Sequence, residues 1–158
     1  MNTLKRKRSR GQSLAEFALI LPLLITLTGA AMDFARVYQA SITLQTATRN
    51  AAEFTATRSV SQSGAQTEAQ RVVCTETQNL PGFTAGSGGS IPTCTAPTVT
   101  VTSFTVSTTA PGASATYPLA TSVVHAELPF RTVIPWPWLP GGTWDIGTTQ
   151  TYTVIQGR

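Results

Sequence analysis

The sequence contains 158 residues, of which 41% are hydrophobic and only 11% are charged. Because globular domains carry roughly 25% charged residues, this composition argues against a solvated cytosolic enzyme and against a disordered charged tail. The net charge of +4 would favour an anionic partner. However, five of the eleven basic residues lie in the first ten positions, and the remaining six arginines and seven acids give a net charge of −1. We therefore expect no nucleic-acid partner.

An apolar run follows the basic cluster at residues 5–10 and begins at Leu14. The sixteen uncharged residues between Glu16 and Asp33 span about 24 Å as a helix, a little less than the ~30 Å hydrocarbon core of a bilayer. This pattern predicts a single transmembrane helix at residues 12–33. The excess of Lys and Arg before it predicts a cytoplasmic N-terminus and an exported C-terminal head.

Three interpretations of this region are open. An ordinary secretory signal peptide, with a small-residue site at Thr28-Gly29-Ala30, would release a soluble head, although its apolar part is usually shorter and uncharged. A plain membrane anchor would never be cleaved and would hold an adhesin-like binding domain outside the membrane. A prepilin leader at residues 1–11 would be cut on the cytoplasmic side, before the apolar run.

Glu16 favours the prepilin leader. Ser13 and Glu16 also fit the S-x-x-E capping box that starts many helices, and both roles can coexist. An ionisable side chain at the edge of the membrane is costly and usually functional. Cleavage between Gly11 and Gln12 would create an α-amine one helical turn from Glu16. This amine and Glu16 of a neighbouring subunit would attract each other by up to about 4 kcal/mol at ~4 Å, before desolvation is subtracted.

The sequence of this region resembles that of the TadE-like pilus assembly proteins. The resemblance rests on Arg10-Gly11-Gln12-Ser13-Leu14-Ala15-Glu16-Phe17, on Leu21-Pro22 within the apolar run, and on Met32-Asp33-Phe34-Ala35-Arg36 at its exit. It covers about residues 10–58.

The resemblance implies a minor pilin-like (pseudopilin) subunit of a Tad-type pilus or secretion system in a bacterial cytoplasmic membrane. A prepilin peptidase would cut between Gly11 and Gln12, and Glu16, Phe17 and Pro22 would act in recognition and assembly. The implied partners are this peptidase, other pilin and pseudopilin subunits, the Tad membrane platform and the lipid bilayer.

The helical pattern continues outside the membrane. Apolar residues recur every three or four positions, and neither Gly nor Pro interrupts residues 30–63. We therefore expect one rod from Ser13 to about Arg58, with Pro22 as its kink and residues 34–63 as its exported, amphipathic continuation.

Two features mark the exported part of this rod. Its alanine-rich stripe would allow close approach to a sheet or to another helix: Ala40, Ala47, Ala51, Ala52 and Ala56. Asp33 and Arg36 lie one turn apart at the membrane exit, and we expect a solvated ion pair between them.

Residues 64–158 are expected to form the exported head. A short helix is predicted at residues 65–77, after a break at 59–64, and a flexible Gly/Ser loop at residues 82–92. Alternating apolar and threonine residues predict strands at 99–106, 115–128 and 148–156. The expected fold is therefore α+β and pilin-like, with the long N-terminal helix packed on a small antiparallel sheet.

Cys74 and Cys94 are the only two cysteines. An even number of cysteines in an exported segment favours a disulfide, which would stabilise the head by roughly 3 kcal/mol in the chain-entropy model.

The segment 130–144 concentrates the aromatic residues of the head. It contains all three tryptophans and several prolines, which disfavour strand pairing: Trp136, Trp138 and Trp144. We expect a rigid loop near the helix exit that shields Phe34 or Tyr38. Contact with the membrane surface or with a partner protein is the functional alternative.

No catalytic motif stands out in the sequence. The lone histidine, His125, reads as an ordinary strand residue, and two cysteines with one distant histidine do not make a metal-binding set. We expect no enzymatic activity, no cofactor and no metal.

Overall fold

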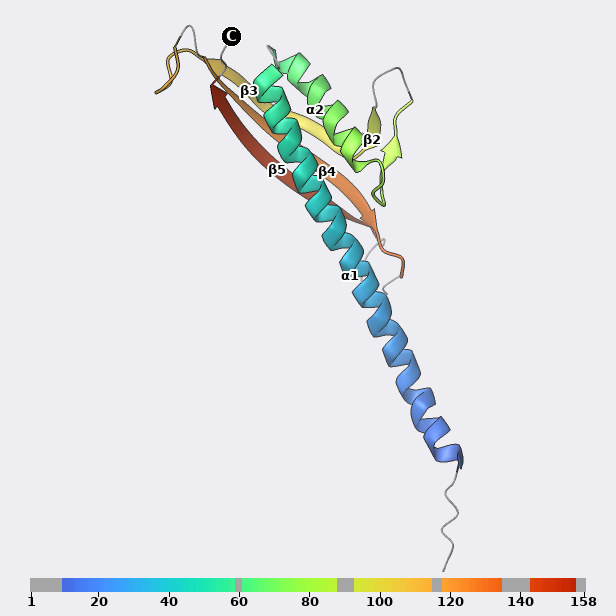
Figure 1. The fold of residues 1–158 in the computed structure, drawn as a ribbon. Helices are drawn as coiled ribbons and strands as arrows, with labels where there is room; N and C mark the ends of the chain where they lie inside the picture. Colours follow the sequence, from blue (N-terminus) through green and yellow to red (C-terminus); the bar gives the residue numbers. More distant parts are fainter. Residues whose placement is uncertain (1–9, 59–60, 88–92, 115–117, 135–142, 156–158) are drawn as a thin grey trace, which may run out of the picture.

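The computed structural model describes residues 10–58, 61–87, 93–114, 118–134 and 143–155. The fold is α+β, as the sequence predicts, and a long N-terminal helix packs on a small antiparallel sheet (Figure 1). The helices are α1 (Arg10–Arg58) and α2 (Gln62–Thr77), and the strands are β1 (Thr84–Ala85), β2 (Cys94–Ala96), β3 (Thr98–Ser107), β4 (Leu119–Arg131) and β5 (Thr143–Ile155).

Helix α1 is a single rod of 49 residues, which corresponds to about 73 Å at ~1.5 Å per residue. Its C-terminal half packs on the sheet and on α2, whereas its N-terminal half protrudes alone (Figure 1). The helix continues through Pro22, although a proline has no N–H to donate to the carbonyl of Ala18. The rod expected from Ser13 to Arg58 is therefore present.

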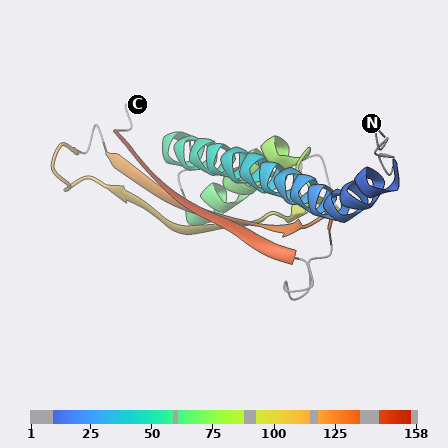
Figure 2. The same ribbon diagram turned by 90° about the horizontal axis from the view of Figure 1, so that it is seen from below.

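The main sheet has three antiparallel strands in the order β3-β4-β5. Both helices cover the same face of this sheet, and no helix of the described residues covers the opposite face (Figure 2). Because successive strand residues point to opposite faces, every second residue of the central strand is buried under the helices. These residues are Ala120, Ser122, Val124, Ala126, Leu128 and Phe130.

The alanine-rich stripe of α1 lies in the core. All five of its alanines are completely buried, and Leu44 is buried among them. Small side chains let the helix backbone approach the sheet and α2 closely, which fills the narrow space between the layers. One buried polar contact crosses these layers, a 2.6 Å hydrogen bond between the hydroxyls of Thr55 on α1 and Ser122 on β4.

Glutamines of α2 cover the outer edge of β3. Gln66 donates to the carbonyl oxygen of Val99 at 2.8 Å and accepts from the backbone N–H of Val101 at 2.7 Å. Gln62 donates to the carbonyl oxygen of Val101, also at 2.7 Å. These side-chain amides satisfy backbone groups that an edge strand would otherwise leave open to another chain.

The boundaries of the second helix and of the loop after it differ from the sequence prediction. Helix α2 begins at Gln62 rather than at residue 65, because the Ser61 hydroxyl caps it by accepting from the N–H of Gly64. Part of the expected Gly/Ser loop is ordered, since Thr84–Ala85 pairs with Cys94–Ala96.

The expectation that segment 130–144 is a loop throughout is wrong at both ends. Phe130 pairs with Trp144, and Arg131 pairs with Thr143. Strand β4 also runs through Pro129, where an interior strand would lose a hydrogen bond. The proline is tolerated because β3 begins at Thr98, opposite Glu127, so that β4 has a neighbour on only one side at Pro129.

Candidate functional site

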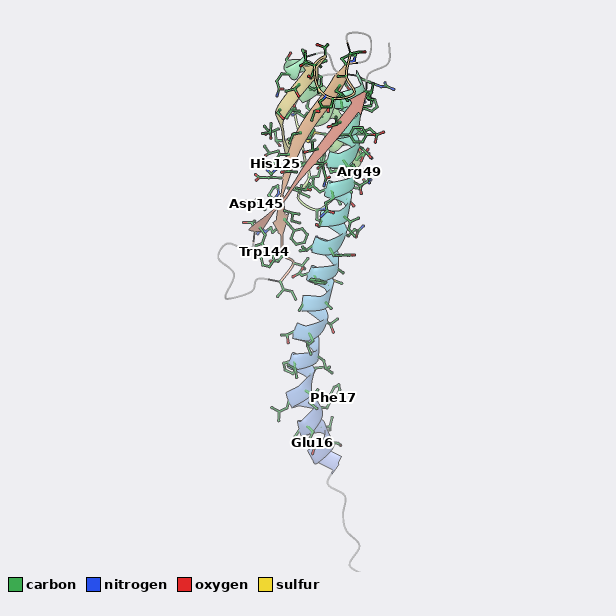
Figure 3. The ribbon with its side chains drawn as sticks, turned by 90° about the vertical axis from the view of Figure 1, so that its left-hand side faces the viewer. Glu16, Phe17, Arg49, His125, Trp144 and Asp145 are labelled. Carbon is green, nitrogen blue, oxygen red and sulfur yellow. A yellow bond between two sulfur atoms is a disulfide. The ribbon has the colours of Figure 1, made fainter. Side chains whose placement is uncertain are left out.

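The expected processing and recognition residues lie at the end of α1 that is farthest from the head. Gly11 and Gln12 belong to the first turn of the helix. Glu16 and Phe17 follow one turn later, and both are exposed (Figure 3). The expected cleavage site and Glu16 therefore lie at the same end of the rod.

The N-terminal half of α1 is bare on every side. Each residue from 13 to 28 is exposed, and Pro22 is among them. The exposed side chains are large and apolar all around the helix: Leu14, Phe17, Leu19, Ile20, Leu21, Leu23, Leu24, Ile25 and Leu27. This helix is long and apolar enough to cross a membrane. Because water would strongly disfavour such a surface, it requires lipid or neighbouring helices.

Asp33 joins the rod to the head at the point where this bare half ends. Only 5% of the residue is exposed, and its two carboxylate oxygens accept the backbone N–H groups of Val133 at 3.0 Å and Ile134 at 3.3 Å. The Nη1 atom of Arg36 lies 3.8 Å from Oδ1 of Asp33. The expected ion pair is therefore present, but it is not solvated as expected, because the carboxylate is buried and fixes the chain just beyond β4.

Two further contacts strengthen this junction. The guanidinium of Arg36 lies over the ring of Phe130, 5.6 Å from its centroid. One turn below Asp33, Cδ1 of Ile134 occupies the place where a Cβ on Gly29 would lie, so the Ile134 side chain packs directly against the helix backbone. Sequence analysis missed both contacts. The one sequence feature that could have indicated this junction was the carboxylate of Asp33, at the end of a long run of uncharged residues.

The structure contains the disulfide between Cys74 and Cys94, with a Cα–Cα distance of 5.6 Å. Cys74 lies in α2 and is almost completely buried, and Cys94 begins β2. The bond fastens the small β1–β2 hairpin to the helix that covers the edge of β3.

The tryptophans expected at an interface are only partly described. Trp136 and Trp138 lie outside the described residues. Trp144 is 47% exposed at the end of the sheet nearest the bare half of α1 (Figure 3). The segment does begin near the helix exit, but Phe34 and Tyr38 remain 73% and 61% exposed. The described part of the segment therefore does not shield these two rings, contrary to expectation.

His125 has partners that sequence analysis did not anticipate. Its Nδ1 lies 2.7 Å from Oγ1 of Thr149, and its Nε2 lies 3.0 Å from Oε1 of Glu127. A carboxylate, an imidazole and a hydroxyl in this order resemble a catalytic triad, but catalysis also requires oxyanion donors and a substrate cleft. Here the three groups lie on the open face of the sheet, where His125 and Thr149 form a cross-strand pair and Glu127 is the next residue on that face of β4.

A groove of about 580 Å³ runs between α1 and α2. Two arginines lie over the ring of Phe54 in this groove, Arg58 at 4.2 Å and Arg71 at 5.3 Å from its centroid. Asn50 donates to both carboxylate oxygens of Glu76 across the groove. These contacts fasten one helix to the other. Within the described residues, no cluster of three or more His, Cys, Asp or Glu side chains could hold a metal ion.

Comparison with known proteins supports the resemblance seen in the sequence. Residues 11–53 match the family described as TadE-like protein. This match begins at the expected cleavage site and includes the bare half of α1, Asp33 and most of the buried alanine stripe. No curated protein and no solved structure matches the chain.

Proposed function

Because residues 11–53 are TadE-like, we propose that this chain is a minor pilin-like (pseudopilin) subunit that helps to assemble a Tad-type pilus. Helix α1 holds it in the bacterial cytoplasmic membrane, with residues 1–11 on the cytoplasmic side and the head exported. A prepilin peptidase removes residues 1–11 by cutting between Gly11 and Gln12.

The carboxylate at the start of a bare apolar helix is the observation that carries this proposal. Glu16 is exposed, and every residue from there to residue 28 is exposed as well. Gln12 and Glu16 are four positions apart, which is about 6 Å along a helix. Cleavage before Gln12 would therefore add a positive charge close to a carboxylate that lies at the edge of the lipid.

The proposed mechanism is association rather than catalysis. The bilayer stores the subunit, because lipid covers the apolar surface of residues 13–28 until other pilin or pseudopilin helices replace it. Glu16 sets the register between neighbouring subunits by pairing with a new α-amine. The head then presents its surface to other subunits and to the Tad membrane platform.

The mature N-terminus provides the first test. We expect intact-mass measurement of the native protein to show the loss of residues 1–11, and N-terminal sequencing to begin at Gln12. The variant Gly11→Ala should retain the full mass. A native chain that begins at Met1 would support the uncleaved, adhesin-like anchor instead. A chain that begins near Ala31 would indicate ordinary signal cleavage.

The variant Glu16→Gln separates the two roles of this residue. Glutamine preserves the capping box at the start of the helix but removes the charge. We expect normal cleavage and membrane insertion but defective pilus assembly, scored as sheared surface filaments. Glu53→Gln is the matched control, since Glu53 is an exposed carboxylate in the packed half of the same helix. Equal assembly by both variants would contradict a role for the Glu16 charge.

A further inference from the structure

The head contacts residues of α1 that lie inside the segment expected to span the membrane, residues 12–33. The chain beyond β4 contacts Asp33 through the N–H groups of Val133 and Ile134, and the side chain of Ile134 continues to Gly29. Gly29 lies four positions before Asp33, about 6 Å deeper along the helix axis. Part of the head therefore lies beside the segment expected to span the membrane.

The length of the apolar run places this contact at lipid depth. The sixteen uncharged residues between Glu16 and Asp33 cover about 24 Å, whereas the hydrocarbon core is ~30 Å thick. If Glu16 lies at the inner boundary, the outer boundary falls beyond Asp33. Tilting the helix would only move that boundary farther toward the head.

The Asp33 carboxylate and the two backbone N–H groups that meet it at this depth are satisfied within the protein. Backbone and carboxylate groups are tolerated within a membrane only where other protein groups pair with them. Asp33 is buried and accepts two backbone N–H groups, which satisfies the carboxylate and the backbone of Val133 and Ile134 together. Such a junction is suited to the margin of a bilayer.

Two large apolar side chains remain exposed close to this junction. Val133 is 60% exposed and Trp144 is 47% exposed. The sequence between Arg131 and Asp145 contains no charged residue and holds all three tryptophans of the chain. Tryptophan is enriched at membrane interfaces, and charged residues at both ends of such a segment suit the headgroup layer.

From these observations we propose that the base of the head, formed by Val133, Ile134 and Trp144, inserts into the outer interface of the bilayer that α1 spans. Its partner is lipid, and Asp33 is the positioning residue that holds the base at the required depth. This inference rests on a membrane-spanning α1, which is part of the proposed function, but it does not depend on cleavage or on assembly.

Tryptophan fluorescence of the full chain in phosphatidylcholine vesicles provides the test, because all three tryptophans lie in residues 136–144. We expect lipids brominated near the headgroup end of the acyl chain to quench the emission more strongly than lipids brominated near its terminus. We also expect aqueous iodide to quench weakly. Strong iodide quenching without lipid quenching would show that the head stands clear of the bilayer and would overturn the proposal.

Two variants of matched chemistry sharpen the result. Val133→Asp places a charge at the base of the head, and because the side chain is already exposed, the head should still fold. We expect lipid quenching to fall roughly twofold, since a charge is disfavoured at this depth. Val106→Asp is the control, because Val106 is 47% exposed at the opposite end of β3 and should leave quenching unchanged.

Other outcomes separate this inference from the proposed function. Equal quenching in wild type and Val133→Asp would overturn the insertion of the base even if the native protein were cleaved after Gly11. Tryptophan emission that changes with the protein-to-lipid ratio, but not with bromination, would identify a second copy of the chain rather than lipid as the partner, and would also overturn it. Protease resistance of each variant head checks that it has folded.

Discussion

The two halves of α1 belong to one continuous helix but have opposite surfaces. In residues 13–28 the large apolar side chains are exposed all around the helix. In residues 33–58 the buried stripe consists mainly of alanine, and Leu44 is its largest apolar side chain. Large side chains therefore face outward in one half, while small side chains face inward in the other.

This difference suits a helix that has one half in lipid, as proposed above, and the other half in a protein core. Lipid accepts bulky apolar groups at any angle, so the bare half needs no amphipathic pattern. The packed half must fit against a sheet and a second helix at interior density, so the size of each side chain matters there. The same substitution should consequently have different effects in the two halves.

Truncation of leucine should show the largest contrast. Leu44→Ala leaves a cavity in the core and should lower the free energy of unfolding of the head by about 2–5 kcal/mol. Leu23→Ala removes the same atoms from a side chain that is 59% exposed and should leave the stability of the head unchanged. Urea unfolding in detergent, followed by tryptophan emission, measures both. Equal losses would contradict the division of the helix into two halves.

Enlargement of alanine tests the same division from the other direction. Ala51 is completely buried, and Ala51→Leu should cost about 1–3 kcal/mol because the added isopropyl group overpacks the space between helix and sheet. Ala18 is exposed in the bare half, and Ala18→Leu should have no effect on the head. A tolerated Ala51→Leu would mean that the layers can move apart.

The sequence was sufficient to predict those elements whose periodicity reflects burial on one face. The long rod, the second helix and the three main strands follow directly from spacing of apolar residues, and the TadE-like resemblance is confirmed over residues 11–53. The strand ends were not predictable from composition. Pro129 can lie within β4 because β3 begins opposite Glu127. That register depends on the pairing of the two strands and cannot be read from the sequence of either strand alone.

Long-range contacts account for the other failures. Asp33 reads as a surface acid next to Arg36, and nothing local indicates that Val133 and Ile134, a hundred residues later, supply its hydrogen bonds. Gly29 likewise reads as one more small residue in an apolar run until Ile134 is placed against it. Local spacing predicts elements, whereas the junction between rod and head depends on their packing.

Threonines provide the smallest contrast between the two halves. Among the described residues, Thr28 in the bare half bonds only to a carbonyl of its own helix, that of Leu24 at 2.8 Å, so Thr28→Val should not change the stability of the head. Thr55 is buried and also bonds to Ser122 on β4, so Thr55→Val should cost about 1 kcal/mol by leaving a buried hydroxyl without its partner.

The double variant Thr55→Val with Ser122→Ala completes this comparison. Removing both hydroxyls leaves neither group unsatisfied, so its loss of stability should be smaller than the sum of the two single losses by about 1 kcal/mol. Urea unfolding of the four proteins gives this coupling energy. Strict additivity would mean that the hydrogen bond does not link α1 to the sheet, and that apolar packing alone distinguishes the packed half of the helix from the bare one.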